Sequence, residues 1–212
     1  MSSKAGGTIF SSAAAEVARR DRVMAQLITR LGPFRLPRPR TDHFAALAES
    51  ILYQQLAGAA ARAIHQRFVA LFDGRLSPEA LLAVRPRKLR AAGLSRAKAA
   101  SMRDLAAKIV DGTVPLRRIG RLSDEDIITH LSVVRGIGRW TAEMFLIFQL
   151  RRLDVWPVDD YGVRQGYSLA YGLRKLLTPK ELQAKGEPFR PYRTVAAWYC
   201  WQAVHEQRAS KR

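Results

Sequence analysis

The apolar and polar positions along the chain follow a helical period almost everywhere. Apolar side chains recur three and four positions apart, and no stretch shows the alternation of a half-buried strand. The pattern predicts helices over residues 13–31, 42–53, 60–71, 97–111, 123–134 and 139–149, and another that begins near Tyr161. We therefore expect an all-α fold with two helical lobes and a cleft between them. Residues 1–12 are predicted to form a mobile tail, and residues 13–212 the folded domain.

A glycine-rich turn separates two of these helices. Gly136 and Gly138 interrupt the helical pattern, and glycine lets a backbone adopt positive φ and approach another molecule closely. Free N–H groups at such a turn and at a helix N-terminus attract anions. The turn therefore predicts phosphate binding, with charge from Arg135 and Arg139 and a hydroxyl from Thr141. The alternative is an ordinary connection between two helices, capped by glycine.

The net charge of the chain bears on the choice between phosphate binding and an ordinary helix connection. The 212 residues carry 36 Lys and Arg against 18 Asp and Glu, a net charge of +18. Such an excess favours a polyanionic partner such as nucleic acid, although a general bias towards basic residues would give the same number. The single cysteine, Cys200, excludes an internal disulfide and a four-cysteine cluster, and the four histidines lack zinc-ligand spacing. No membrane span or secretion signal is recognisable, so we expect a cytoplasmic protein.

The segment GIGRWTAEMFLIFQLRRLDVWPVDDYGVRQG resembles the helix-hairpin-helix DNA glycosylases. Within them it is most similar to the DNA-3-methyladenine glycosylase II group, which removes alkylated bases. The resemblance departs from the family pattern where a leading Leu is shifted or replaced by Val133 or Val134. It implies a hairpin motif over residues 123–150, a two-lobed helical fold without an iron–sulfur cluster, and double-stranded DNA with damaged bases as the partner.

The resemblance also implies roles for individual residues. Asp160 takes the position of the catalytic carboxylate, and a carboxylate there stabilises positive charge that develops on the deoxyribose. The alternative for both Asp159 and Asp160 is capping of the helix that follows. Since base chemistry in a duplex requires extrusion of the nucleotide, aromatic walls are also expected. The residues assigned to contact the base are Trp140, Trp201, Met144 and Tyr53.

The segment around residue 54 resembles the turn that family members insert into DNA. Gln54 and Gln55 are the candidates for filling the gap left by the extruded base. The alternative is a connection between helices in which the glutamines bond to backbone groups.

Reaction type and cofactors follow from the same resemblance. Relatives that also cut the DNA strand form a Schiff base with a lysine at the position of Trp140, and no lysine occurs between Lys108 and Lys175. A monofunctional, water-based reaction without a required cofactor is expected, by a monomer associated with the nucleoid. A sodium or potassium ion bound by the backbone carbonyls of Ser132, Val134 and Ile137 is also implied. Two alternatives stay open: removal of oxidised or deaminated bases, and a catalytically silent DNA-binding module.

Overall fold

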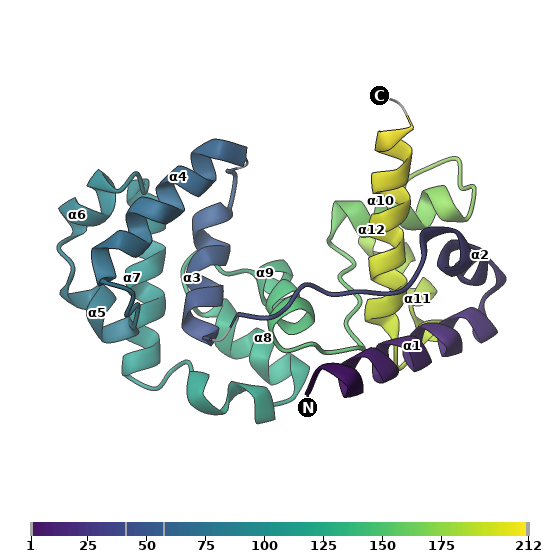
Figure 1. The fold of residues 1–212 in the computed structure, drawn as a ribbon, viewed down its shortest axis with the longest axis horizontal. Helices are drawn as coiled ribbons and strands as arrows, with labels where there is room; N and C mark the ends of the chain where they lie inside the picture. The colour runs from purple at the N-terminus through teal and green to yellow at the C-terminus, as the bar shows by residue number, and fades with distance from the viewer. Residues whose placement is uncertain (1, 41, 57, 211–212) are drawn as a thin grey trace. The chain divides into compact units, whose positions relative to one another are not determined.

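The structure of the chain is a computed structural model that describes residues 2–40, 42–56 and 58–210, and every regular element among these residues is a helix (Figure 1). The all-α prediction is therefore confirmed. The short elements η1, η2 and η4 are 3₁₀ turns, and η3 is a π-helical turn. In chain order the elements are α1 (Ser2–Arg20), α2 (Arg22–Leu31), α3 (His43–Tyr53), α4 (Gly58–Val69), η1 (Ala70–Phe72), α5 (Pro78–Ala83), α6 (Pro86–Ala91), α7 (Arg96–Val110), η2 (Leu116–Arg121), α8 (Asp124–Ser132), α9 (Arg139–Met144), η3 (Phe145–Gln149), α10 (Tyr161–Ala170), α11 (Pro179–Lys185), η4 (Glu187–Phe189) and α12 (Arg193–Ala209).

The chain divides into two compact units, as expected for two helical lobes. Unit 1 combines residues up to 38 with residues from 151 onwards, and unit 2 comprises residues 39–150. None of the helices in the described residues is long and apolar enough to span a membrane.

Unit 1 is organised around α12. This helix packs against α10 and α2, and α1 packs against α2. Val17, Met24, Val195 and Tyr199 are fully buried between these helices, and the Tyr199 hydroxyl donates a hydrogen bond to the Gly32 carbonyl at 2.8 Å. Because α12 contacts so much of the unit, any side chain on its α10-facing surface has a well-defined position.

The N-terminal region differs from the prediction. The pattern predicted one helix over residues 13–31, but the backbone leaves the helical conformation at Asp21, whose carboxylate accepts the Met24 N–H and caps α2. Residues 2–12, expected to form a mobile tail, are helical as part of α1, and the Phe10 ring packs edge-on against Phe34 at 5.1 Å; the mobility of this segment stays a prediction. Met1 lies outside the described residues.

Unit 2 is organised around α7. Its Met102 and Leu105 are fully buried, and α7 packs against α5, α3 and α6. Three helices of this unit begin at a side-chain cap. Asp42, Ser77 and Ser95 cap α3, α5 and α7, each accepting a backbone N–H three residues on.

Candidate active site

The predicted glycine hairpin lies in unit 2 between α8 and α9. Helix α8 begins after Ser123, whose hydroxyl accepts the Asp126 N–H, as the sequence predicted. After α8 the backbone turns through Gly136, whose φ of +79° lies in the left-handed region. Gly138 is the N-cap of α9 and supplies no side-chain cap. The start of α9 is therefore lined by backbone groups instead of a capping side chain.

Side chains of helix α7 contact this hairpin. The Arg135 backbone N–H donates to Asp104 Oδ2 at 2.7 Å, and Lys108 Nζ donates to Asp104 Oδ1 at 2.6 Å. Burial alone would raise the pKa of Asp104, but these two hydrogen bonds outweigh it, and the pKa lies below its usual value. A Cβ at Gly136 would lie 2.8 Å from Ser101 Oγ. The hairpin is thus fitted closely onto α7.

The predicted phosphate-binding side chains differ in their surroundings. Arg135 is exposed. The Arg139 guanidinium instead forms ion pairs with Glu125 at 2.6 Å and with Glu143 at 3.2 Å, and these carboxylates raise its pKa. Thr141 is only 5% exposed. The side chain of Arg135 therefore suits a phosphate contact best, whereas Arg139 joins α8 to α9 and the Thr141 side chain faces the interior.

The glutamine turn lies next to the hairpin in unit 2. Gln54 Nε2 donates to the Gly136 carbonyl at 2.9 Å, and Lys98 Nζ donates to the carbonyls of Leu52 and Gln54 at 2.7 and 2.6 Å. Gln55 is exposed and has a left-handed φ of +55°. Gln54 therefore matches the alternative prediction of a glutamine that bonds to backbone, and Gln55 is the better candidate for insertion into DNA.

The candidate base-contacting residues of unit 2 are not core residues. Trp140 on α9 is 44% exposed. Tyr53 and Met144 are half-buried, and the Tyr53 ring lies 6.0 Å from that of His65. Their predicted contacts with an extruded base stay predictions.

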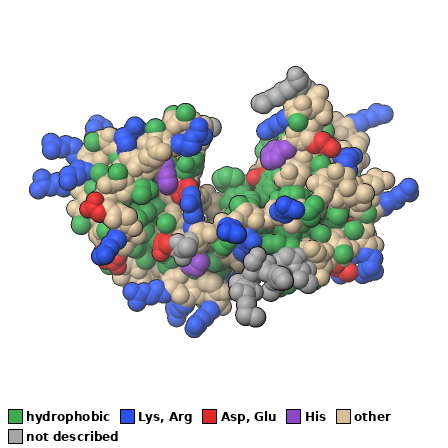
Figure 2. Space-filling model, in the orientation of Figure 1, with side chains coloured by type: hydrophobic (Ala, Val, Ile, Leu, Met, Phe, Trp, Pro, Cys, Tyr) green, Lys and Arg blue, Asp and Glu red, His purple; other side chains and the backbone are tan. Residues whose placement is uncertain are grey.

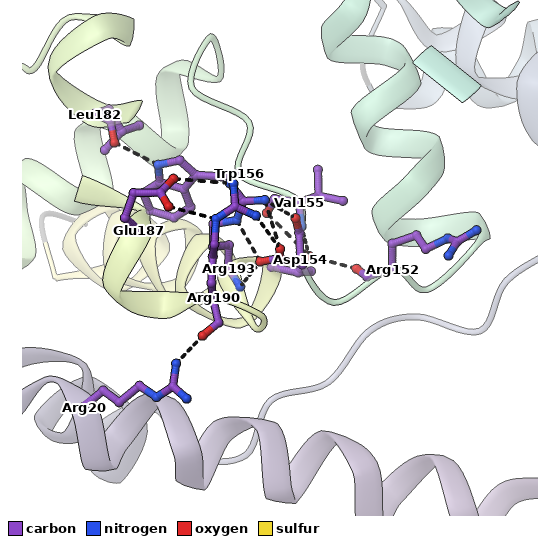
Figure 3. Close-up of polar contacts among 10 residues, drawn as sticks. Arg20, Arg152, Asp154, Val155, Trp156, Leu182, Glu187, Arg190 and Arg193 are labelled. Carbon is purple, nitrogen blue, oxygen red and sulfur yellow. Dashed lines mark hydrogen bonds and ion pairs between the residues drawn. The ribbon is translucent and has the colours of Figure 1, made fainter. Parts of the chain in front are cut away.

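In unit 1 the segment that leads to Asp160 is tied to the start of α12. Arg193 donates to both carboxylate oxygens of Asp154, at 2.7 and 3.0 Å, and Arg190 donates to Asp154 Oδ2 at 3.0 Å (Figure 3). The Thr194 hydroxyl accepts the Val155 N–H at 3.0 Å. These bonds fix the backbone of residues 152–156, although this segment has no regular secondary structure.

The two adjacent aspartates that follow have different environments. Asp160 is half-buried and is the N-cap of α10, with its Oδ1 accepting the Val163 N–H at 2.8 Å. The same oxygen accepts the indole N–H of Trp201, also at 2.8 Å. Asp159 is exposed. The capping role that the sequence left open for either aspartate belongs to Asp160, which also contacts the aromatic side chain predicted to lie near it.

Two glycines allow α10 to approach α12 this closely. A Cβ at Gly166 would lie 1.9 Å from the Cys200 carbonyl oxygen, and a Cβ at Gly162 would lie 2.9 Å from Trp201 Cδ1. Neither distance is compatible with a side chain, so both positions require glycine in this packing. Cys200 is fully buried, and burial, together with the Asp160 charge, raises the pKa of its thiol. It is a core residue, and its thiol stays protonated.

Two other tryptophans of unit 1 are structural. Trp156 is 5% exposed, and its indole N–H donates to the Leu182 carbonyl at 2.9 Å (Figure 3). Trp198 packs edge-on against Phe34 and Tyr199. Trp201 is therefore the tryptophan of unit 1 that contacts the candidate catalytic group.

The described residues contain no cluster of His, Cys, Asp or Glu side chains that could bind a metal ion. In the hairpin the Val134 carbonyl accepts the Ile137 N–H at 3.0 Å, which leaves a second lone pair for another contact. Binding of a monovalent cation by the carbonyls of Ser132, Val134 and Ile137 stays a prediction. Lys and Arg side chains are far more frequent than acidic ones on the face drawn in Figure 2, in line with the net charge of +18.

Comparison with known proteins then places this arrangement in a family. The model described as the HhH-GPD superfamily of base excision DNA repair proteins matches residues 48–191, which include the glutamine turn, the hairpin and the Asp160 segment. The chain belongs to this superfamily. The resemblance seen in the sequence is confirmed.

Individual members of the superfamily resemble the chain over most of its length. DNA-3-methyladenine glycosylase 1 of Schizosaccharomyces pombe is 36% identical over 182 residues, covering 84% of this chain and 80% of the relative. The solved structure of a DNA-3-methyladenine glycosidase from Bacillus halodurans matches with a TM-score of 0.86 at 34% identity, over 93% of this chain and 91% of that one. The S. pombe 3-methyladenine DNA glycosylase in complex with abasic DNA matches with a TM-score of 0.80 at 34% identity, over 90% and 95% of the two chains.

Sequence reasoning missed the residues that support the site. Asp104, Ser101 and Lys98 hold the hairpin and the glutamine turn, and Gly162 makes room for Trp201. For the residues of α7, the available signal was the spacing of Lys98, Ser101 and Asp104, three residues apart, which places them on one face of the predicted helix. It does not predict what they contact.

Proposed function

We propose that this member of the superfamily is a monofunctional DNA glycosylase that removes alkylated bases, such as 3-methyladenine and 7-methylguanine, from double-stranded DNA during base excision repair. The observation that carries the proposal is the Asp160 carboxylate, held by two donors at the N-terminus of α10. The names of the relatives support the substrate class, and the abasic DNA bound to the S. pombe enzyme supports a DNA partner.

In the proposed reaction the hairpin binds the sugar–phosphate backbone, and a damaged nucleotide leaves the base stack. The bond between the base nitrogen and C1′ breaks, and its electron pair leaves with the base. Positive charge develops on the deoxyribose, and the Asp160 carboxylate stabilises it. Water then bonds to C1′ and loses a proton, which completes the hydrolysis. A base alkylated on a ring nitrogen is cationic, so it leaves as a neutral molecule without an added proton.

The selectivity proposed here comes from the exposed and half-buried aromatic residues. An electron-rich indole face attracts a cationic base more strongly than a neutral one. Trp140 is the main candidate for this contact, with Tyr53 and Met144 as further contacts. We further propose that the protein acts as a monomer in the cytoplasm, associated with the nucleoid, and requires no cofactor apart from a sodium or potassium ion at the hairpin.

The test compares bases released from methylated, oxidised and deaminated duplex DNA by mass spectrometry. We expect 3-methyladenine release that leaves the abasic strand intact. Asp160→Asn should lower the rate by at least about 100-fold, because Asn still accepts both hydrogen bonds and caps the helix but lacks the charge. Asp159→Asn is the matched control and should retain most of the activity, since Asp159 is exposed. Unchanged release by Asp160→Asn refutes the proposed role, and a covalent adduct trapped by borohydride refutes the water-based reaction.

A further inference from the structure

Trp201 reaches Asp160 with its polar edge. The sequence assigned this residue to the wall of a base pocket, a role that would use the flat face of the indole. In the structure its Nε1–H donates to Asp160 Oδ1 at 2.8 Å. The Val163 backbone N–H donates to the same oxygen, also at 2.8 Å. Two donors converging on one oxygen fix both torsion angles of this short side chain, and therefore the direction of the second carboxylate oxygen.

The contact depends on the missing side chain at Gly162. A Cβ there would lie 2.9 Å from Trp201 Cδ1, 3.2 Å from Trp201 Nε1 and 3.1 Å from Asp160 Oδ1. A methyl group at this position would therefore clash with the Trp201 indole, which is the donor, and lie very close to Asp160 Oδ1, which is the acceptor. The φ of Gly162 is not positive. The requirement for glycine at position 162 is consequently one of space, and not of backbone conformation.

The position of Trp201 is itself fixed by its neighbours on α12. The preceding residue, Cys200, is fully buried, and its carbonyl oxygen lies where a Cβ of Gly166 would be. At the start of the same helix, Thr194 and Arg193 bind the segment that leads to Asp160. One rigid helix thus determines where the indole N–H lies and where the chain approaches Asp160.

We propose that Trp201 is a positioning residue, whose indole N–H orients the Asp160 carboxylate for catalysis, and that Gly162 is the residue that makes this hydrogen bond possible. This inference rests on the proposed function. It assigns Trp201 a role through Asp160 instead of through the base, and it assigns a role to Gly162, which the sequence left without one.

The first experiment tests whether Trp201 acts through its indole N–H, as a hydrogen-bond donor, or through its aromatic face, as a wall of a base pocket. Trp201→Phe keeps an aromatic face but removes the N–H, and Trp201→Ala removes both. If the indole orients Asp160, Trp201→Phe lowers the single-turnover rate of base release by about 10- to 100-fold, as expected for the loss of a hydrogen bond to a charged group. The affinity for duplex DNA with an abasic site should stay within about twofold, because the hairpin that binds the backbone is unchanged. A wild-type rate in Trp201→Phe, with a slow Trp201→Ala, would show that the residue is a wall and overturn the proposal.

The second experiment changes the space and leaves the tryptophan intact. Gly162→Ala should lower the rate by a similar factor, while Gly120→Ala is the matched control, because a Cβ at Gly120 has no neighbour within 4 Å. A wild-type rate in Gly162→Ala contradicts the role of this glycine.

The third measurement reads the hydrogen bond without any substrate. In a ¹⁵N–¹H spectrum of the folded protein, the Trp201 indole signal is assigned from its absence in Trp201→Phe. Replacing the acceptor in Asp160→Ala should shift this signal upfield, and Asp159→Ala should leave it in place. An unchanged Trp201 signal in Asp160→Ala shows that the hydrogen bond does not exist. This measurement needs no catalytic activity, so it applies to variants that release no base.

Failure of this inference is distinct from failure of the proposed function. No base release by the wild-type protein refutes the function, and with it the role of Trp201 in the reaction. Release that is lost in Asp160→Asn but kept in Trp201→Phe and Gly162→Ala refutes the positioning role alone.

Discussion

The two hairpin glycines look equivalent in the sequence, but substitutions at them should have different effects. Gly136→Ala introduces two costs. Its φ of +79° is in the left-handed region, which costs a residue with a Cβ about 1–2 kcal/mol. The new Cβ would also lie 2.8 Å from Ser101 Oγ and 3.4 Å from Ser101 Cβ. Ser101 is buried in α7, so it has little room to move, and overpacking of this kind costs about 1–3 kcal/mol.

A double-mutant cycle separates these costs. We expect Gly136→Ala to lower the free energy of unfolding by about 2–5 kcal/mol, measured by urea denaturation followed by circular dichroism. Ser101→Ala removes the hydroxyl, so adding Gly136→Ala to the Ser101→Ala variant should cost only the conformational part of about 1–2 kcal/mol. The coupling energy between the two positions then equals the contact cost. Additive effects, with a coupling energy below about 0.5 kcal/mol, would refute the contact with Ser101.

Gly138→Ala is the matched control within the same turn. Gly138 has a φ of −95°, and a Cβ there meets nothing within 4 Å. Gly138→Ala should therefore fold almost as well as the wild-type protein but bind a fluorescent abasic duplex more weakly, because in the proposed complex the new methyl group would keep a phosphate away from the backbone N–H groups at the start of α9. Gly136→Ala should weaken both properties. Close approach of the hairpin backbone to DNA, taken alone, predicts that Gly136→Val reduces DNA affinity without loss of folding; the contact with Ser101 adds a folding cost to that expectation.

Three further predictions follow from other parts of the structure. Burial raises the pKa of Tyr167 and Tyr199 from 10.0 to about 12. The stability that their neutral phenols contribute is therefore present below pH 10 and lost as the pH rises from 10 to 12. Urea denaturation at pH 8, 10 and 11 measures the loss of unfolding free energy, and Tyr199→Phe should reduce this loss. Gln55→Ala should lower the rate of base release by about tenfold or more if this residue fills the gap in the stack, whereas Gln54→Ala should mainly lower stability, by about 1 kcal/mol, through loss of its bond to the hairpin. Asp104→Ala removes the acceptor for the Arg135 N–H and should cost about 1–2 kcal/mol in unfolding free energy; a wild-type value would contradict its role in holding the hairpin.

The sequence predicted the parts of the fold that depend on neighbours in the chain. Ser77 and Ser123 cap helices, because a cap is formed by residues only a few positions apart and is visible in the sequence. The break at Asp21 was missed because the apolar period of residues 13–31 continues across it, and a cap within a continuous period is difficult to distinguish from an exposed polar residue. The helix over residues 139–149 was predicted correctly in extent, but its second half is a π-helical turn, in which the Leu150 N–H bonds to the Phe145 carbonyl.

The candidate site could be predicted only in part for the same reason. Motif spacing located Asp160, the hairpin and the glutamine turn. It gave the same weight to Gln54 and Gln55 and to Arg135 and Arg139, and their contacts then distinguished the members of each pair. In each pair one member bonds to or packs against residues distant in the sequence, such as Gly136 for Gln54 and Glu125 for Arg139.

The supporting residues show why such pairs are hard to resolve from one sequence. In the sequence, Gly162 looks like any glycine in a helix. Such a glycine lowers helix stability by about 1 kcal/mol relative to alanine. Its value arises only because Trp201, thirty-nine positions later, occupies the space beside it. Gly162 lies in the first turn of α10, where a poor helix former costs little. Its missing side chain leaves room for the hydrogen bond from Trp201 to Asp160, the carboxylate that the proposed chemistry requires. If that reasoning holds, Gly162→Ala should be neutral or stabilising in helix propensity yet harmful to catalysis, and the two effects can be measured separately.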